Sequence, residues 1–267
     1  MSDICLITGN HPRHEYFARK LIESGKICGW VVERREELIP PTPRNLGSDL
    51  KEVFRHHFRE RERIESEFFG NFCNKERSLV PCFHVDRKEL NSNLTFEFVK
   101  KCCPSLIISY GCHKISDNFI QAVGGRFWNT HGGLSPQYRG VATHFWPSYF
   151  LEPQMTGMTL HETTDNLDGG AVIFQTSAPM VSGDTLHRLA ARTVQDFCDQ
   201  LASHVVRIEF TNLPRGLSQD SYGRVFMRKD WRPEHLQLIY GNYKDSIVDA
   251  LLNGDIQGRE PELLSVL

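Results

Sequence analysis

Two short segments of this chain carry side chains that can stabilise charge and move protons. Asn129 and His131 lie two residues apart and directly precede the pair Gly132-Gly133, while Asp168 precedes a second pair of glycines. Alternate residues of a strand point to the same face, so the amide and the imidazole are predicted to share one pocket. The glycines would end that strand and let the backbone approach a ligand.

An amide, an imidazole and a carboxylate together could pass an acyl group to an amine. Attack on a carbonyl carbon gives a tetrahedral state whose oxygen gains negative charge, and a carboxamide N–H and an imidazolium can stabilise it in a water-poor site. The amine must lose a proton, and Asp168 could hold the imidazole charged or order a water that carries the proton. Local alternatives remain, since Asn-x-His also occurs in turns and Asp-Gly-Gly is a common hairpin sequence.

At these residues the chain resembles the folate-dependent formyltransferases, which include the glycinamide ribonucleotide, methionyl-tRNA and sugar-nucleotide N-formyltransferases. The family pattern is Asn-x-His, then Leu-x-Pro-x-Tyr-Arg-Gly, then a Leu-Asp-x-Gly loop. Here it corresponds to Asn129 and His131, to Leu134, Pro136, Tyr138, Arg139 and Gly140, and to Leu167, Asp168 and Gly170. The family's His-Pro-Ser-Leu-Leu-Pro is replaced by His131-Gly132-Gly133-Leu134-Ser135-Pro136, so the loop on the acceptor side is expected to differ in shape.

The resemblance implies N10-formyltetrahydrofolate as the formyl donor and Asn129, His131 and Asp168 as the catalytic residues. It also implies that the backbone of two segments holds the pterin, whose edge alternates donors and acceptors as a peptide does. For the side chains of His113 and Lys114 the alternative is a plain surface turn. The donor-binding residues expected on this basis are Tyr110, Gly111, Cys112, His113, Lys114, Ile115, Thr164, Asp165 and Leu167.

A second set of residues is expected on the acceptor side. Asn10 and Arg13 lie at the first strand-to-helix turn, where a helix N-terminus could receive a phosphate. His144 follows what is expected to be a turn at residues 138–140, whereas core packing is the favoured role of Phe145 and Trp146. The expected acceptor-binding residues are Asn10, Arg13, Gly132, Gly133, Tyr138, Arg139 and His144.

The elements that position these residues are expected to form an α/β, Rossmann-like formyltransferase fold with a mostly parallel sheet. Apolar runs alternate with helical spacing, which is typical of a sheet covered on both faces. Ligands of such sheets bind beyond the carboxyl ends of the strands, where Asn129 lies. The predicted strands are 4–8, 27–32, 79–85, 106–109, 126–129, 158–161 and 171–174, and the predicted helices after the first are 96–101, 117–123 and one through 186–205.

Two parts of the chain lie outside the pattern of the family. Residues 1–211 are predicted to form the catalytic domain, with a charged helical insertion at about 49–69, and residues 212–267 a small C-terminal appendage. The insertion mixes both charge signs with phenylalanines, which favours a solvated helix with one packed edge. The alternative is a basic face that grips an anionic acceptor.

Composition narrows the remaining classes of function. A formal charge of −2 gives no electrostatic attraction to nucleic acid. The eight scattered cysteines fit free thiols in a reducing cytoplasm, and their spacing does not indicate a metal site. Neither a signal peptide nor a membrane span is expected, and the absence of G-x-G-x-x-G argues against a nicotinamide dinucleotide. A homodimer remains open.

The acceptor is the least determined part of this interpretation. By elimination a primary amine of a nucleotide-linked amino sugar is favoured, because a purine-pathway enzyme is usually little more than the core and the tRNA enzyme has a larger basic domain. Alternative acceptors are a hydroxyornithine of siderophore synthesis, glycinamide ribonucleotide and methionyl-tRNA. A formyl-folate hydrolase and a non-catalytic folate-binding module also remain open.

Overall fold

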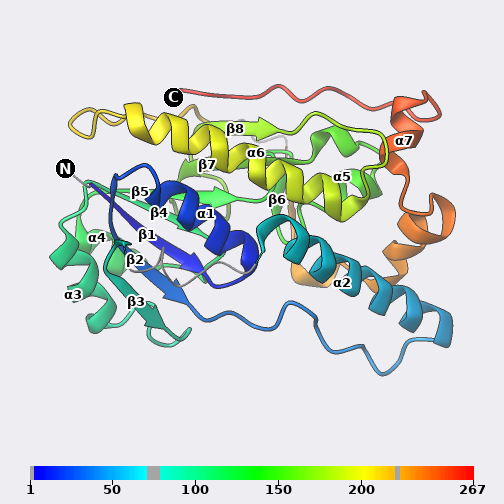
Figure 1. The fold of residues 1–267 in the computed structure, drawn as a ribbon, viewed down its shortest axis with the longest axis horizontal. Helices are drawn as coiled ribbons and strands as arrows, with labels where there is room; N and C mark the ends of the chain where they lie inside the picture. Colours follow the sequence, from blue (N-terminus) through cyan, green and yellow to red (C-terminus); the bar gives the residue numbers. More distant parts are fainter. Residues whose placement is uncertain (1–2, 71–78, 220–222) are drawn as a thin grey trace.

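A seven-stranded sheet forms the centre of the computed structural model, which describes residues 3–70, 79–219 and 223–267 (Figure 1). The strand order is β3-β2-β1-β4-β5-β7-β8, with β1 to β5 parallel and β7 and β8 antiparallel at one side. The predicted mostly parallel α/β sheet is therefore confirmed. The strands of this sheet are β1 (Ile4–Gly9), β2 (Ile27–Glu33), β3 (Cys82–Val85), β4 (Leu106–Tyr110), β5 (Arg126–His131), β7 (Gly157–Glu162) and β8 (Val172–Ser177).

Helices cover both faces of the sheet (Figure 1). Strand β1 alternates between the two layers, since Ile4 and Leu6 pack into the core beneath α1 and α6, whereas Cys5 and Ile7 pack on the side of α3 and α4. A strand buried on both faces needs such a continuous apolar run. The helices are α1 (Pro12–Ile22), α2 (Ser48–Phe69), α3 (Asn93–Cys102), α4 (Asp117–Val123), α5 (Trp146–Tyr149), α6 (Leu186–Arg207) and α7 (Ile247–Leu252).

Two predicted segments differ from the structure. The strand predicted over 79–85 begins only at Cys82, because Pro81 has no N–H to donate to a ladder. The turn predicted at Tyr138-Arg139-Gly140 is instead strand β6 (Tyr138–Gly140), which pairs in parallel with β9 (Arg224–Phe226). Its partner lies far away in the sequence, so local spacing could not reveal the pairing.

The part of the chain after residue 211, here called the C-terminal segment, packs against helix α2 and the region around α5. Phe54 and Phe58 of α2 share a core with Trp146, Leu236 and Ile239. This segment also contains η3 (Arg228–Asp230), η4 (Pro233–His235) and the π-helix η5 (Gln237–Asn242), while the short helix η2 (Pro153–Met155) precedes β7. Helix α2 thus has the expected packed edge, and the division of the chain at residue 211 stays a prediction.

The end of the chain lies along the outer strand of the sheet. Gln175 N–H donates to Leu264 O over 2.9 Å, and Val266 N–H donates to Ile173 O over 2.9 Å. These bonds occupy backbone groups of β8 that would otherwise form an exposed edge. No helix of the described residues is long and apolar enough to cross a membrane.

Candidate active site

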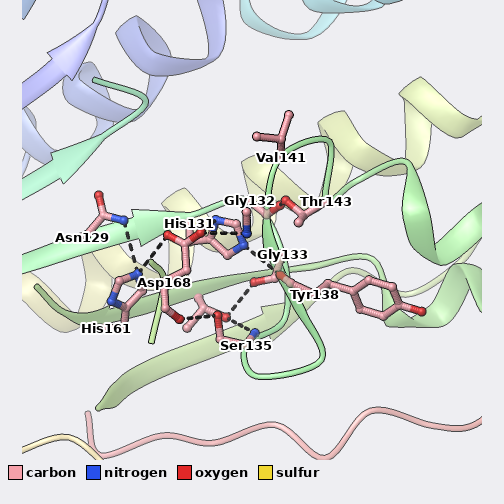
Figure 2. A network of polar contacts seen from close by, with 12 residues as sticks. Asn129, His131, Gly132, Gly133, Ser135, Tyr138, Val141, Thr143, His161 and Asp168 are labelled. Atoms are coloured by element: carbon pink, nitrogen blue, oxygen red, sulfur yellow. Dashed lines mark hydrogen bonds and ion pairs between the residues drawn. The ribbon is translucent and has the colours of Figure 1, made fainter. Parts of the chain in front are cut away.

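The carboxyl end of β5 carries the predicted amide and imidazole, and β7 lies beside it. Asn129 is paired with His161 across the antiparallel ladder, and Asn129 Nδ2 lies 3.2 Å from His161 Nε2. Asp168 contacts both imidazoles, with His131 Nδ1 3.3 Å from Oδ2 and His161 Nε2 3.6 Å from Oδ1. Figure 2 shows these four side chains in one group, so the structure brings the three predicted catalytic residues together.

Neighbouring hydrogen bonds fix the orientation of the Asn129 amide. Ser109 Oγ donates to Asn129 Oδ1 over 2.8 Å, which turns the NH₂ group toward His161. His161 Nδ1–H donates to the Glu162 carbonyl over 2.8 Å, so Nε2 is the ring nitrogen that faces Asn129 and Asp168. One N–H of the amide faces His161 and the other is available to a ligand.

The His131 imidazole is buried, and each of its nitrogens has a polar neighbour. Nε2–H donates to the Tyr138 carbonyl over 2.8 Å, and Nδ1 faces the Asp168 carboxylate. Burial lowers the pKa of His131, while the Asp168 carboxylate acts in the opposite direction. The resting ring is therefore neutral near pH 7, and a proton on Nδ1 would gain a carboxylate partner.

A set of backbone contacts fixes the Asp168 loop. Gly140 N–H donates to Asp168 Oδ2 over 2.9 Å, and the Asp168 carbonyl accepts from Gln219 Nε2 over 2.9 Å. Burial alone would raise the pKa of Asp168, but His131, His161 and the Gly140 N–H lower it to about 2. Asp168 is thus an ionised and oriented carboxylate at neutral pH.

The two glycines after β5 are required by close packing. A Cβ on Gly133 would lie 2.5 Å from the Tyr138 carbonyl oxygen and 2.7 Å from His131 Nε2. At Gly132 the space is less tight, since a Cβ would lie 3.1 Å from the His144 ring. The unusual Gly-Gly sequence therefore lets the loop fold closely over the His131 imidazole.

His161 and Gln219 are functional candidates that the sequence analysis missed. His161 lies at the end of the strand that leads into the Asp168 loop, and this position in the sequence could have identified it as a candidate. Gln219 binds the carbonyls of Asp168 and Gly170 from the C-terminal segment. No local sequence signal links that glutamine to the site, because the contact depends on the path of the chain after residue 211.

The predicted donor-binding residues lie in two segments, 110–115 and 163–168, which approach each other next to this group. Lys114 Nζ lies 3.9 Å from Asp165 Oδ1, which joins the segments. Thr163 Oγ1 is buried without a hydrogen-bond partner among the described residues. The Tyr110 side chain is buried in the core instead, and the His113 ring pairs with Glu33 over 2.7 Å.

The positions of the other donor-binding candidates vary in exposure. Ile115 is buried, Gly111 and Cys112 are partly exposed, and Thr164 and Leu167 are exposed on the Asp168 loop.

The predicted acceptor-binding residues divide into two groups. Gly132, Gly133 and His144 lie beside His131, and Arg139 Nη1 lies 3.3 Å from the place of a Cβ on Gly169. Its Nε is buried without a hydrogen-bond partner in the described part of the chain.

The other three acceptor-side candidates, Asn10, Arg13 and Tyr138, make polar contacts with other residues of the protein. Asn10 Oδ1 accepts from the Arg35 N–H, and Arg13 pairs with Glu65. Tyr138 supplies its carbonyl to His131, whereas its hydroxyl donates to Glu152 away from the site (Figure 2). Phe145 and Trp146 are buried in the core, as favoured from the sequence.

Comparisons with known proteins agree on one family. A family model described as formyl transferase matches residues 56–205 of the chain. The trifunctional purine biosynthetic protein adenosine-3 of Gallus gallus is 30% identical over 125 residues, which are 44% of this chain and 12% of that protein. The chain thus matches about an eighth of the length of this curated relative.

Solved structures show the same fold. A sugar N-formyltransferase from Shewanella sp. has a TM-score of 0.56 at 17% identity and is covered over 87% of its chain and 90% of this one. A phosphoribosylglycinamide formyltransferase from Anaplasma phagocytophilum has a TM-score of 0.53 at 16% identity, with 98% of its chain and 85% of this one covered. A 4-N formyltransferase from Francisella tularensis has a TM-score of 0.55 at 15% identity, with 78% and 86% covered.

Proposed function

Because the chain belongs to the formyl transferase family, we propose that it transfers a formyl group from N10-formyltetrahydrofolate to a primary amine. The observation that carries this proposal is the single group formed by Asn129, His131 and Asp168 at the carboxyl end of β5. In open α/β sheets this end of the strands is where ligands bind. The bound donor would supply the electrophilic formyl carbon. Its C–N10 bond would break as the bond to the amine forms, and the departing tetrahydrofolate would take up one proton in exchange for the one that the amine loses.

We propose a distinct task for each of the three residues. Asn129 has an N–H that does not face His161 and can donate to an oxygen that gains negative charge. His131 Nδ1 can receive a proton released by the amine, because the resulting imidazolium faces Asp168. Asp168, with its lowered pKa, stays ionised through the reaction and stabilises that imidazolium.

The donor is proposed to bind between segments 110–115 and 163–168. Lys114 and Asp165 lie close to each other across these segments, and the buried hydroxyl of Thr163 offers an unused polar atom there. Both segments continue from strands that flank Asn129 in the sheet. A donor held there would present its formyl group to the Asn129 amide.

A nucleotide-linked amino sugar is the proposed acceptor. Support comes from chain architecture, because the phosphoribosylglycinamide formyltransferase from Anaplasma is covered over 98% of its chain while 15% of this chain lies outside the match. The sugar N-formyltransferase from Shewanella matches a larger share of this chain. Gln219 of the C-terminal segment also donates to the Asp168 carbonyl, and it lies outside residues 56–205, which the family model matches.

Glycinamide ribonucleotide is the second candidate acceptor. The relative that is 30% identical is named as a purine biosynthetic protein, and one structure of similar fold is a phosphoribosylglycinamide formyltransferase. Both candidates are amines joined to a phosphorylated ribose, so they make similar demands on the acceptor side.

An acceptor screen tests the proposal. The purified chain is incubated with N10-formyltetrahydrofolate and nucleotide-linked amino sugars, glycinamide ribonucleotide, hydroxyornithine or methionyl-tRNA, and formylated products are detected by mass spectrometry. We expect transfer to an amino sugar, at a rate lower by roughly 10²–10³ in His131→Ala. Donor consumption without any amine would identify a hydrolase, and donor binding without turnover would identify a non-catalytic module; either result rejects the proposal.

A further inference from the structure

Arg13 and Arg61 bind the same oxygen of one buried carboxylate. Arg13, in the first turn of α1, donates its Nε–H to Glu65 Oε1 over 2.5 Å. Arg61 Nε lies 3.7 Å from that oxygen, one helical turn away on α2. The Glu65 side chain is 2% exposed, whereas those of Arg13 and Arg61 are 14% and 30% exposed. The two arginine side chains are therefore partly exposed, whereas the carboxylate is enclosed.

The charges of this group do not balance. Burial alone would raise the pKa of Glu65, but Arg13 and Arg61 lower it, so Glu65 supplies one negative charge against two positive ones. Burial lowers the pKa values of the neighbouring His11 and His144, so these rings are neutral. Within residues 3–70, 79–219 and 223–267, no second carboxylate forms an ion pair with Arg13 or Arg61. Since charges at low exposure are normally paired, the site favours an added anion.

His144 places this pair of guanidinium groups next to the candidate active site. Its Nε2–H donates to the Gly157 carbonyl over 3.1 Å, which leaves Nδ1 as an acceptor 3.5 Å from Arg13 Nη1. The same ring packs over Gly132, the residue that follows His131. One imidazole ring therefore separates the guanidinium pair from the loop of the catalytic histidine.

We propose that Arg13 and Arg61 bind a phosphate or diphosphate group of the acceptor, an inference that rests on the proposed function. A guanidinium group binds phosphate oxygens through two parallel N–H donors. Glu65 fixes Arg13 before the ligand arrives and limits repulsion between the two cations in the free protein. Helix α2 thus acts as an acceptor-binding element rather than only as a solvated insertion.

Calorimetric titration of the full chain tests this site without any need for turnover. The probes are inorganic phosphate, pyrophosphate, uridine diphosphate and uridine. We expect saturable binding of the phosphate-bearing probes, no binding of uridine, and a loss of about tenfold or more in affinity in Arg61→Gln, since hydrogen bonds to charged groups are lost. A preference for pyrophosphate over phosphate identifies a diphosphate ligand, and the reverse identifies a single phosphate group.

Arg63→Gln is the matched control on the same helix. Arg63 is exposed and pairs with Glu60 and Glu67, so its replacement should change anion affinity less than twofold. Arg61→Lys keeps the charge but loses the planar donor pair, and provides the comparison if Arg61→Gln does not fold. Saturable binding that is equal in the parent and in the Arg61 variants would overturn the proposal, as would no saturable anion binding by the parent.

Steady-state kinetics separate this proposal from the proposed function. With the acceptor from the screen, Arg61→Gln should raise the acceptor KM about tenfold or more and leave kcat and the donor KM within a few-fold. Anion binding that depends on Arg61 in a chain without transferase activity would reject the proposed function and keep the anion site. Transfer with an acceptor KM unchanged in Arg61→Gln would reject the anion site alone.

Discussion

At the scale of single residues, Asp168 is the centre of the candidate active site. Its two oxygens contact different imidazoles, His131 and His161, and one of them also accepts the Gly140 N–H. A carboxylate so bound cannot move without disturbing both rings. The effects of replacing these residues should therefore be strongly coupled, as is usual for groups that act as one unit.

Asn129→Ala and His131→Ala should each lower kcat by roughly 10²–10³, which is typical for the loss of one donor to a developing oxyanion. Donor affinity should change little, because the proposed donor contacts lie in segments 110–115 and 163–168. Stopped-time product analysis and donor titration measure the two quantities. If melting temperature and activity fell together in both variants, the two residues would be structural.

Asp168→Asn keeps the size of the side chain and removes its charge. Turnover should fall by about 10²–10⁴, the range of general acid–base assistance, because the imidazolium of His131 loses its partner. Steady-state kinetics with a formyl-folate donor measure this effect, with donor affinity as the internal control. Turnover within a few-fold of the parent would contradict the assigned role.

At the scale of elements, the end of β5 is shaped by two glycines with different surroundings. A Cβ on Gly133 would meet backbone at 2.5 Å, whereas a Cβ on Gly132 would meet the His144 ring at 3.1 Å. Backbone gives way less readily than a side chain. The loop after β5 should therefore tolerate a methyl group at one glycine better than at the other.

Gly133→Ala should lower the free energy of unfolding by about 1–3 kcal/mol, the usual cost of overpacking, and Gly132→Ala by clearly less. Chemical denaturation of both variants gives this comparison, and each serves as the control for the other. Equal losses would mean that the loop relaxes freely around either methyl group. Activity should be reduced more in Gly133→Ala, because the added methyl group would press on His131.

At the scale of the whole molecule, buried histidines join helix α2, helix α6 and the C-terminal segment. His57 Nδ1 lies 2.9 Å from the Tyr240 hydroxyl and 3.2 Å from His187 Nε2. Burial and the nearby Arg61 lower the pKa of His57 to about 3, and burial and His57 lower the pKa of His187. Both rings are therefore neutral in the folded protein over the physiological range.

These histidines should make the fold sensitive to acid. Above pH 6.5 both histidines are neutral in the folded and in the unfolded chain, so they do not change the free energy of unfolding with pH. As the pH falls from 6.5 toward 3, the unfolded chain binds protons that folded His57 does not, so the free energy of unfolding decreases. The slope is about 1.4 kcal/mol per pH unit for each such histidine.

Denaturant titrations at pH 7.5, 6 and 5 measure this effect. His57→Gln should lose less stability than the parent between pH 6 and 5, because one protonation site of the unfolded chain is gone. The exposed neighbour His56 provides the control, since His56→Gln should leave the slope unchanged. An unchanged slope in His57→Gln would contradict the proposed linkage.

The sequence by itself determined the family and the sheet, and it predicted the three residues that meet in the candidate site. Continuous apolar runs such as Ile4 to Ile7 specify strands that are buried on both faces, because both faces must exclude water. Asn129 and His131 share a face because the strand repeat is two residues. These features follow from local periodicity or from residue types at short spacing, which a linear sequence records directly.

Tertiary structure decided the rest, because the remaining contacts join residues that are distant in the chain. His161 enters the site only through the antiparallel register of β7 against β5, and β6 exists only because β9 pairs with it. Arg13 and Arg61 share a carboxylate because α1 and α2 pack side by side. Periodicity fixes which face a residue occupies, whereas the partner across that face depends on how the elements pack.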